Sequence, residues 1–222
     1  LGLAYYQHGW LLKAMEEYRK AIDLNPNFAS PVANLSRILR DTGRLNEALP
    51  LMERSIIINP GRATYYFDLG LLYIYLAQDS LAEHWLRYSM RIQPDLTYPY
   101  NDLAKLYATQ GKLNEAKALM DQSVTQSPDD PFVLVGAGEI ALWLGNLAKA
   151  KQYFEHASEL SPVESRPTTQ LAYIAWKEGR QADAERLIAQ SLVALKKYAA
   201  EGNEDCSLPY DNARILTIQG KN

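Results

Sequence analysis

The sequence predicts an all-α fold built from antiparallel helix pairs, because it repeats with a fixed period and its apolar residues follow helical spacing. Three residue types recur 34 positions apart, in constant phase with one another. They are the prolines Pro26, Pro60, Pro94, Pro128 and Pro162, the alanines Ala14, Ala48, Ala82, Ala116, Ala150 and Ala184, and the glycines Gly9, Gly43, Gly111, Gly145 and Gly179, with Ala77 in the one gap of the glycine series. A period of this length is typical of helical hairpin arrays. The alternation of apolar and polar residues that marks β-strands is absent.

Each period is predicted to hold two helices of about a dozen residues. In one period Leu103, Leu106 and Tyr107 lie three and four positions apart, as on one face of a helix. A glycine such as Gly43 ends the first helix, since a residue without Cβ adopts positive φ without strain. A proline such as Pro60 lacks the backbone N–H of a continuing helix, so it ends the second helix.

Small and bulky positions are distributed regularly over each helix pair. Every first helix carries a small residue at the same phase, namely Gly2, Ser36, Gly70, Ala104, Gly138 and Ala172. The periodic alanines are the small residues of the second helices. Bulky side chains lie beside them, at Tyr5, Leu39, Tyr73 and Tyr107 on first helices and at Tyr18, Met52, Leu86, Met120 and Phe154 on second helices. Small residues let two helices approach closely, so we expect the core of each pair at this contact.

The phase divides the chain into successive units. Residues 1–28 form a partial unit, and five complete units follow at 29–62, 63–96, 97–130, 131–164 and 165–198. Residues 199–205 are expected to extend the last helix and then break as a linker, and residues 206–222 to form the first helix of a truncated seventh unit. Because both ends lack polar caps, we expect a segment of a longer polypeptide, with self-association through the uncapped ends.

The composition excludes several classes of protein. The 222 residues are 47% hydrophobic and 22% charged, which is ordinary for a globular protein. The net charge of −3 argues against a nucleic-acid binder, whose domains carry a basic excess. The single cysteine, Cys206, excludes an internal disulfide. No apolar run approaches the roughly 18 residues of a membrane span. We take the cytoplasm as the default compartment.

No constellation of residues predicts catalysis, a metal site or a cofactor. The three histidines, His8, His84 and His156, fall at different phases of the repeat, so we expect them on solvated helix faces. Cys206 follows Glu204 and Asp205, whose negative charges make it a poor nucleophile. A glycine-rich phosphate loop is also lacking. We therefore expect no enzymatic activity and no cofactor.

In these features the chain resembles the tetratricopeptide repeat family, whose 34-residue unit is a helix-turn-helix with a small residue in each helix and a proline near its end. In the second unit the match comprises Leu35, Ser36, Leu39, Gly43, Ala48, Met52, Ser55 and Pro60. The resemblance covers six units and the first helix of a seventh, and only the sixth unit lacks the proline, with Lys196 in its place. It implies a right-handed superhelical solenoid whose first helices line a concave groove for an extended peptide or a partner helix.

Carried over by register, the resemblance implies a set of groove residues that bind a protein or peptide partner. They are Asn34, Arg37, Phe67, Asp68, Tyr75, Tyr98, Asp102, Lys105, Glu139, Trp143, Gln170, Tyr173 and Trp176. The same register adds Tyr6, Arg40 and Lys177 to a wider set.

Two features of this set leave alternatives open. One phase, interrupted by Gly136, holds the polar residues Asn34, Asp68, Asp102, Gln170 and Asp211, and from this phase the family bonds the backbone of a bound peptide. The alternative is that these side chains bond neighbouring helices. The aromatic members either form a binding hot spot or belong to the core between repeats.

The family's clamp for the terminal carboxylates of chaperone tails is not matched. Leu3, Thr64 and Asp68 stand where that clamp requires an amide and two cations. We therefore expect a non-catalytic protein-protein interaction scaffold with a different specificity, and no contact with nucleic acid or membrane. The alternative is a regulatory or sensor region of a larger signalling or transcription-regulating protein, with its effector domain outside this sequence.

Overall fold

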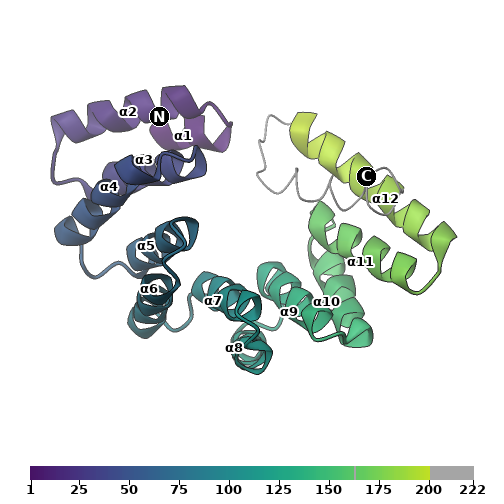
Figure 1. The fold of residues 1–222 in the computed structure, drawn as a ribbon. Coiled ribbons are helices and arrows are strands. Elements are labelled where there is room, and N and C mark those ends of the chain that lie inside the picture. The colour runs from purple at the N-terminus through teal and green to yellow at the C-terminus, as the bar shows by residue number, and fades with distance from the viewer. Residues whose placement is uncertain (163, 201–222) are drawn as a thin grey trace. The chain divides into compact units, whose positions relative to one another are not determined.

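The computed structural model describes residues 1–162 and 164–200, with side chains as far as Leu195. Every regular element in these residues is an α-helix, which confirms the predicted all-α class for this part of the chain. The helices are α1 (Gly2–Gln7), α2 (Leu11–Leu24), α3 (Ala29–Asp41), α4 (Leu45–Ile58), α5 (Ala63–Tyr75), α6 (Asp79–Ile92), α7 (Tyr98–Thr109), α8 (Leu113–Gln126), α9 (Pro131–Trp143), α10 (Leu147–Leu160), α11 (Ser165–Lys177) and α12 (Gln181–Ala200) (Figure 1).

The helices are grouped in two compact units. The first unit is Leu1–Thr109 and contains α1 to α7, and the second begins at Gln110 and contains α8 to α12. Within each unit, every helix packs against the helix that follows it in the chain. Odd-numbered helices up to α11 are the first helices of the predicted repeats, and even-numbered helices are the second helices. The boundaries of the repeats stay a prediction for both units.

The end of the chain is only partly described. Helix α12 continues to Ala200, into the region expected to extend the sixth repeat. The break predicted after it, and the first helix predicted at 206–222, lie outside the described residues.

The turn inside each pair has the glycine conformation that the sequence predicts. Gly43 has a φ of 76°. Its N–H bonds to Arg40 O at 2.9 Å, and the N–H of Arg44 bonds back to Leu39 O at 2.7 Å. This is the Schellman arrangement, which satisfies the last carbonyl groups of a helix and requires a left-handed residue. Ala77 has the same role in the third turn, with a φ of 55°.

Small residues on the first helices make room for bulky side chains on the second helices. A Cβ added at Gly2 would lie 2.7 Å from the Tyr18 ring, and one added at Gly138 would lie 2.5 Å from the Phe154 ring. Both rings belong to the buried cores of their units. The predicted contact between small and bulky positions is thus observed in both units. The face of each of these first helices that carries the glycine therefore packs against the second helix of its pair.

Candidate partner-binding faces

A cluster of charged side chains joins α3 to α5 in the first unit. Arg37 donates from Nε to Asp68 Oδ2 at 2.7 Å, and its Nη2 lies 2.6 Å from the same oxygen. Arg40 donates from Nη1 to the other oxygen, Oδ1, at 3.1 Å. One carboxylate therefore binds two guanidinium groups across two helix pairs. Charge-assisted hydrogen bonds of this kind are roughly twice as strong as neutral ones.

The members of this cluster differ in exposure. The Asp68 side chain is 4% exposed, whereas that of Arg37 is 28% exposed and that of Arg40 is 12% exposed. Burial lowers the pKa of a guanidinium, but Asp68 outweighs burial for Arg37, and Asp41 together with Asp68 outweighs it for Arg40. The pKa of both arginines is thus raised, and both stay charged.

Three neighbours extend the cluster toward α1. Arg37 Nη1 donates to Asn34 Oδ1 at 2.8 Å. Arg40 Nε donates to Asp41 Oδ1 at 3.0 Å, and the Tyr6 hydroxyl donates to Asp41 Oδ2 at 3.2 Å. Burial and the Asp41 carboxylate raise the pKa of Tyr6 to about 12, so its hydroxyl stays protonated as a donor. We call Arg37, Arg40, Asp41 and Asp68 the arginine–aspartate cluster.

The same unit carries aromatic side chains at predicted positions on α5 and α7. Phe67 precedes Asp68, and its ring centroid lies 5.9 Å from that of Tyr98. Tyr98 is 47% exposed, and Tyr75 at the end of α5 is 60% exposed. Phe67 is half-buried. We call these three rings and the arginine–aspartate cluster together the first-helix face of unit 1.

The other predicted residues of this unit lie on α7. Asp102 and Lys105 are both half-buried there. At the phase shared by Asn34 and Asp68, Asn34 accepts from Arg37 of its own helix, whereas Asp68 accepts from Arg37 and Arg40 of the preceding helix pair. Whether these groups also contact a partner stays a prediction.

The second unit presents aromatic groups on α9 and α11. Trp143, at the end of α9, is 48% exposed. The rings of Tyr173 and Trp176 on α11 are half-buried and lie 6.0 Å apart. Lys177 Nζ lies 5.7 Å from the centroid of each of these two rings, which is within the range of a cation–π contact.

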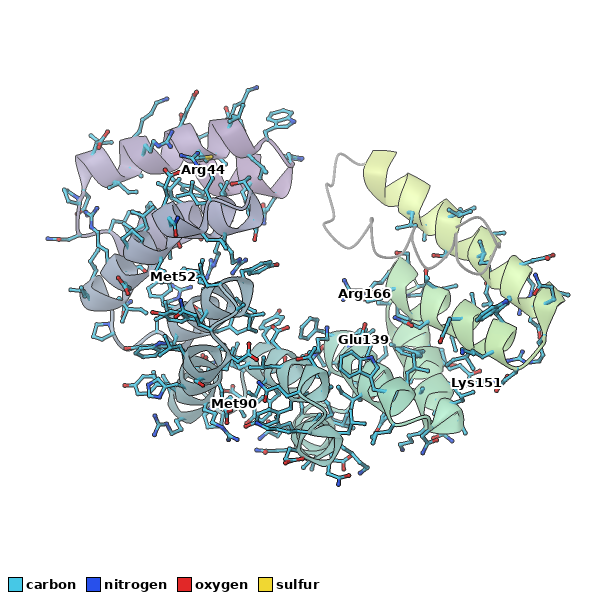
Figure 2. All side chains as sticks on the ribbon, viewed as in Figure 1. Arg44, Met52, Met90, Glu139, Lys151 and Arg166 are labelled. Atoms are coloured by element: carbon cyan, nitrogen blue, oxygen red, sulfur yellow. The ribbon has the colours of Figure 1, made fainter. Side chains whose placement is uncertain are left out.

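Two polar residues of the predicted set differ sharply in exposure within this unit. Glu139 is half-buried on α9, where Figure 2 labels it. Gln170 on α11 is fully buried at 0% exposure. A side chain so deeply buried in the free protein contacts a partner only if the surrounding packing opens. Gln170 is therefore the predicted residue that is least accessible to a ligand.

Some of the predicted residues lie against one another in the structure. Three groups are in direct contact: Asn34 and Asp68 with Arg37, Phe67 with Tyr98, and Tyr173 with Trp176. The sequence-based set missed Asp41. Its phase holds Gln7, Tyr75 and Trp143 in other units, so the repeat gives no signal for a carboxylate there.

The histidines pack against other side chains. His8 and His84 lie against Trp10 and Trp85, with ring centroids 5.8 and 4.8 Å apart. His156 Nε2 lies 3.2 Å from an Asp129 carboxylate oxygen. Among the described residues, no group of three His, Cys, Asp or Glu side chains could hold a metal ion. In the same part of the chain, no helix has the length and apolar character of a membrane span.

Comparison with known proteins identifies the repeats. Sequence models described as tetratricopeptide repeat match residues 1–28, 33–59, 106–166 and 165–190. Human Protein O-mannosyl-transferase TMTC3 is 25% identical over 181 residues, which is 80% of this chain and 20% of that protein. Bovine BBSome complex member BBS4 is 26% identical over 174 residues, which is 78% of this chain and 32% of that protein. The chain thus spans less than a third of either relative.

Solved structures show the same fold. The Cut9 and Hcn1 tetramer of APC/C matches with a TM-score of 0.76 and 13% identity over 98% of this chain and 41% of the other. Yeast Tom70 matches with a TM-score of 0.74 and 15% identity, over 94% of this chain and 43% of the other. A tetratricopeptide repeat protein from Parabacteroides merdae matches with a TM-score of 0.73 and 18% identity, over 99% of this chain and 82% of the other. With repeat matches along its length and this fold, the chain belongs to the tetratricopeptide repeat family.

Proposed function

We propose that the chain is a non-catalytic scaffold that binds a peptide segment or a partner helix of another protein in a concave groove lined by the first helices. The tetratricopeptide repeats and the neighbouring repeat proteins support a protein-interaction scaffold. The finer proposal concerns the groove and the residues that contact the ligand. The candidates are the thirteen residues predicted from the repeat register, of which Asp68 and Gln170 are buried in the free protein.

One observation carries the finer proposal. Three large aromatic side chains at predicted groove positions are exposed: Tyr75 by 60%, Tyr98 by 47% and Trp143 by 48%. Tyrosine and tryptophan are enriched in the hot spots of protein interfaces, because a rigid ring buries a large area at little cost in side-chain entropy. Exposed rings at these positions are therefore available to a partner without rearrangement of the core.

We assign no transferase chemistry to the chain. Human TMTC3 is named a transferase, but the matched segment is 20% of that protein. The groups on the first-helix face of unit 1 are arginines paired with carboxylates and aromatic rings, which suit recognition. Turnover by the isolated chain that one substitution at Arg37, Tyr98 or Trp143 abolished would contradict this assignment.

The peptide-binding proposal can be tested by selecting a displayed random peptide library on the full chain. Binding of the selected peptides is then measured by calorimetry for Tyr98→Ala and Trp143→Ala. We expect each substitution to weaken binding of the peptides that contact it by about 1 to 3 kcal/mol, with helicity unchanged. Ile57→Ala and Leu160→Ala are matched controls, because these side chains are 80% and 43% exposed on the second helices α4 and α10. Equal losses in variants and controls would contradict binding at the first helices.

A second candidate is a regulatory or sensor repeat region of a larger signalling or transcription-regulating protein. The relatives favour this candidate, since the matched segment is 20% of human TMTC3 and 32% of bovine BBS4. The test is the sequence of the full natural polypeptide. A DNA-binding, cyclase, kinase or transferase module in the same polypeptide would support this candidate, and its absence would leave the scaffold role alone.

A further inference from the structure

The hydrophobic core of unit 2 is divided where its last two helix pairs meet. Leu171 and Ile174 on α11 pack with the buried core around Phe154 of α10. Leu187 on α12 instead packs with a separate core that includes Ala184 of its own helix. In unit 1, by contrast, one core runs from α1 to α6. The described part of unit 2 therefore has a gap between apolar clusters that unit 1 fills.

A cavity of about 230 Å³ lies at this gap. Leu171, Ile174 and Leu187 supply its apolar lining, and Lys151 and Arg186 belong to its charged rim. Figure 2 labels Lys151, which lies on α10. Because the lining comes from α10, α11 and α12, we call this space the α10–α12 cavity. Its lining in the described residues shares no member with the thirteen predicted groove residues, so it is a site apart from the proposed groove.

The register shows why the space at Leu187 is not filled from α12. The same phase of the third repeat holds Trp85, which packs against the core of unit 1. The same phase of the fifth repeat holds Tyr153, which packs against the core around Phe154. A leucine side chain is smaller than either ring, so it leaves more of the space between successive second helices open.

The volume of the α10–α12 cavity sets the size of its ligand. An apolar cavity of about 150 Å³ is enough to hold benzene, a molecule of six carbon atoms. The volume of about 230 Å³ therefore accommodates a hydrocarbon group of about that size together with a small polar head. It falls below the roughly 300 Å³ at which pockets for larger ligands and cofactors begin.

The rim of the cavity offers cations whose nearest carboxylates are not hydrogen-bonded to them. Lys151 Nζ lies 3.7 Å from Glu155 Oε1, and Arg186 Nη2 lies 3.6 Å from Asp183 Oδ1. Both distances are longer than a hydrogen bond. Asp183 already accepts from Arg180, a third cation of the rim, at 2.7 Å. Loose, exposed ion pairs contribute little to stability, so a ligand carboxylate can take their place at Lys151 and Arg186.

We propose that the α10–α12 cavity binds a small monocarboxylate with a hydrocarbon chain of about six carbon atoms. The chain packs on Leu171, Ile174 and Leu187. The carboxylate accepts charge-assisted hydrogen bonds from Lys151 and Arg186. This inference goes beyond the proposed function and does not depend on it, because the cavity and the predicted groove have no residue in common.

The test titrates hexanoate, hexan-1-ol and hexylamine into the full chain and follows the methyl groups of leucine and isoleucine by NMR. A ligand of about eight non-hydrogen atoms binds with a Kd on the order of 0.1 to 1 mM, so the titration extends to millimolar concentrations. We expect saturable shifts at Leu171, Ile174 and Leu187. Hexanoate should bind about tenfold more tightly than hexan-1-ol, as for hydrogen bonds to charged groups. Hexylamine should bind most weakly, because the cations of the rim repel it.

A variant that fills the cavity tests the place of the hydrocarbon chain. Leu187→Trp introduces the side chain that Trp85 provides at the same phase, and it should weaken hexanoate binding at least tenfold. Circular dichroism and thermal unfolding check that the variant is folded. Leu171→Phe is a second filled variant, to be used where Leu187→Trp loses its helical signal.

A second variant tests the place of the carboxylate. Lys151→Gln/Arg186→Gln should abolish the preference for hexanoate over hexan-1-ol while both compounds still bind. The matched control is Arg44→Gln/Lys117→Gln, which removes two exposed cations outside the cavity, each paired with a carboxylate three or four residues further on. Both double variants change the net charge equally, so the control should keep the preference.

Three results would overturn the proposal. The first is the absence of saturable hexanoate binding to the natural chain. The second is hexanoate binding that stays unchanged when the cavity is filled. The third concerns the head group, and it is a preference for hexanoate that persists in Lys151→Gln/Arg186→Gln or disappears equally in the control.

Discussion

The Arg37 guanidinium on α3 lies 2.6 Å from the Asp68 carboxylate on α5, and this ion pair joins the first helices of two successive helix pairs. Arg40 binds the second oxygen of the same carboxylate. Asp68 is therefore a carboxylate shared by two cations, and Arg40 has Asp41 as a second one. This asymmetry makes the effects of substitution at the three residues unequal.

Asp68→Ala should destabilise the chain by about 2 to 4 kcal/mol, because it leaves the partly buried guanidinium of Arg37 without a carboxylate and Arg40 with Asp41 alone. Arg37→Ala should cost less, since Arg40 still neutralises Asp68. Urea-induced loss of helical circular dichroism measures both free energies of unfolding.

The double substitution Arg37→Gln/Asp68→Asn serves as the reference for this comparison. It removes a cation and an anion together, so its cost should be smaller than that of Asp68→Ala alone. A larger cost for Arg37→Ala than for Asp68→Ala would show that Asp68 is not the shared acceptor that the geometry indicates.

Gly138→Ala should destabilise the second unit by about 1 to 3 kcal/mol through overpacking. A Cβ at this position would lie 2.5 Å from Phe154 Cε1 and 2.7 Å from Phe154 Cζ, and the ring is fully buried. Thermal unfolding followed by circular dichroism gives the change in stability. Adding Phe154→Met gives this position the side chain that Met52 provides opposite Ser36 in the repeat register, and should recover part of the loss. No recovery would mean that the ring is not the source of the strain.

The helix pairs could be predicted from the sequence because their causes are local and repeated. The glycine at each turn is needed for its positive φ, and the small residue on each first helix is needed for the approach of a bulky side chain. Gly43 and Gly138 meet these two requirements as the period predicts. Similar residues recur at the same positions of every repeat. The same helix pair can therefore be predicted for each repeat of the described chain.

The contacts of the predicted groove residues could be predicted only in part. Arg37 and Arg40 stand at phases that hold Leu71 and Ile74 in the next repeat, so the repeat pattern does not predict a charged cluster there. The register leaves open whether Asp68 bonds a peptide or a neighbouring helix, and in the structure its two oxygens accept from arginines of the preceding helix pair. The exposure of a ring depends on its neighbours as well. This is why Tyr75 is 60% exposed whereas Trp176, also aromatic and at the end of a first helix, is half-buried.

Ala77→Gly should stabilise the chain by about 1 kcal/mol, because Ala77 holds a φ of 55° at which a Cβ is strained. Its backbone makes the same bonds as the glycine turns, from its own N–H to Ile74 O at 3.0 Å and from Gln78 N–H to Tyr73 O at 2.9 Å. Gly43→Ala is the reverse change. A Cβ there would meet nothing within 4 Å, so the cost of about 1 kcal/mol comes from φ alone. Opposite signs in urea unfolding are expected, and the same sign for both substitutions would refute a backbone origin.

Tyr6 should give the chain a specific loss of stability at alkaline pH. Burial, the charge of Asp41 and the hydrogen bond to it raise the pKa of Tyr6 from 10.0 to about 12 in the folded state. Between these two values the folded chain keeps a proton that the unfolded chain releases. The folded state then binds more protons, so the free energy of unfolding falls as the pH rises. The contribution is complete below about pH 10 and is lost as the pH passes the folded-state pKa.

Tyr6→Phe removes this contribution and leaves the other tyrosines unchanged. At neutral pH the variant should be less stable than the natural chain by about 1 kcal/mol, the typical worth of one hydrogen bond. This difference should shrink as the pH rises from 10 toward 12, because ionisation of Tyr6 lowers the free energy of unfolding of the natural chain alone. Urea unfolding at several pH values measures it, with Tyr75→Phe as a control at a side chain that is 60% exposed. A difference that stays constant across this range would mean that the Tyr6 hydroxyl does not donate to Asp41 in solution.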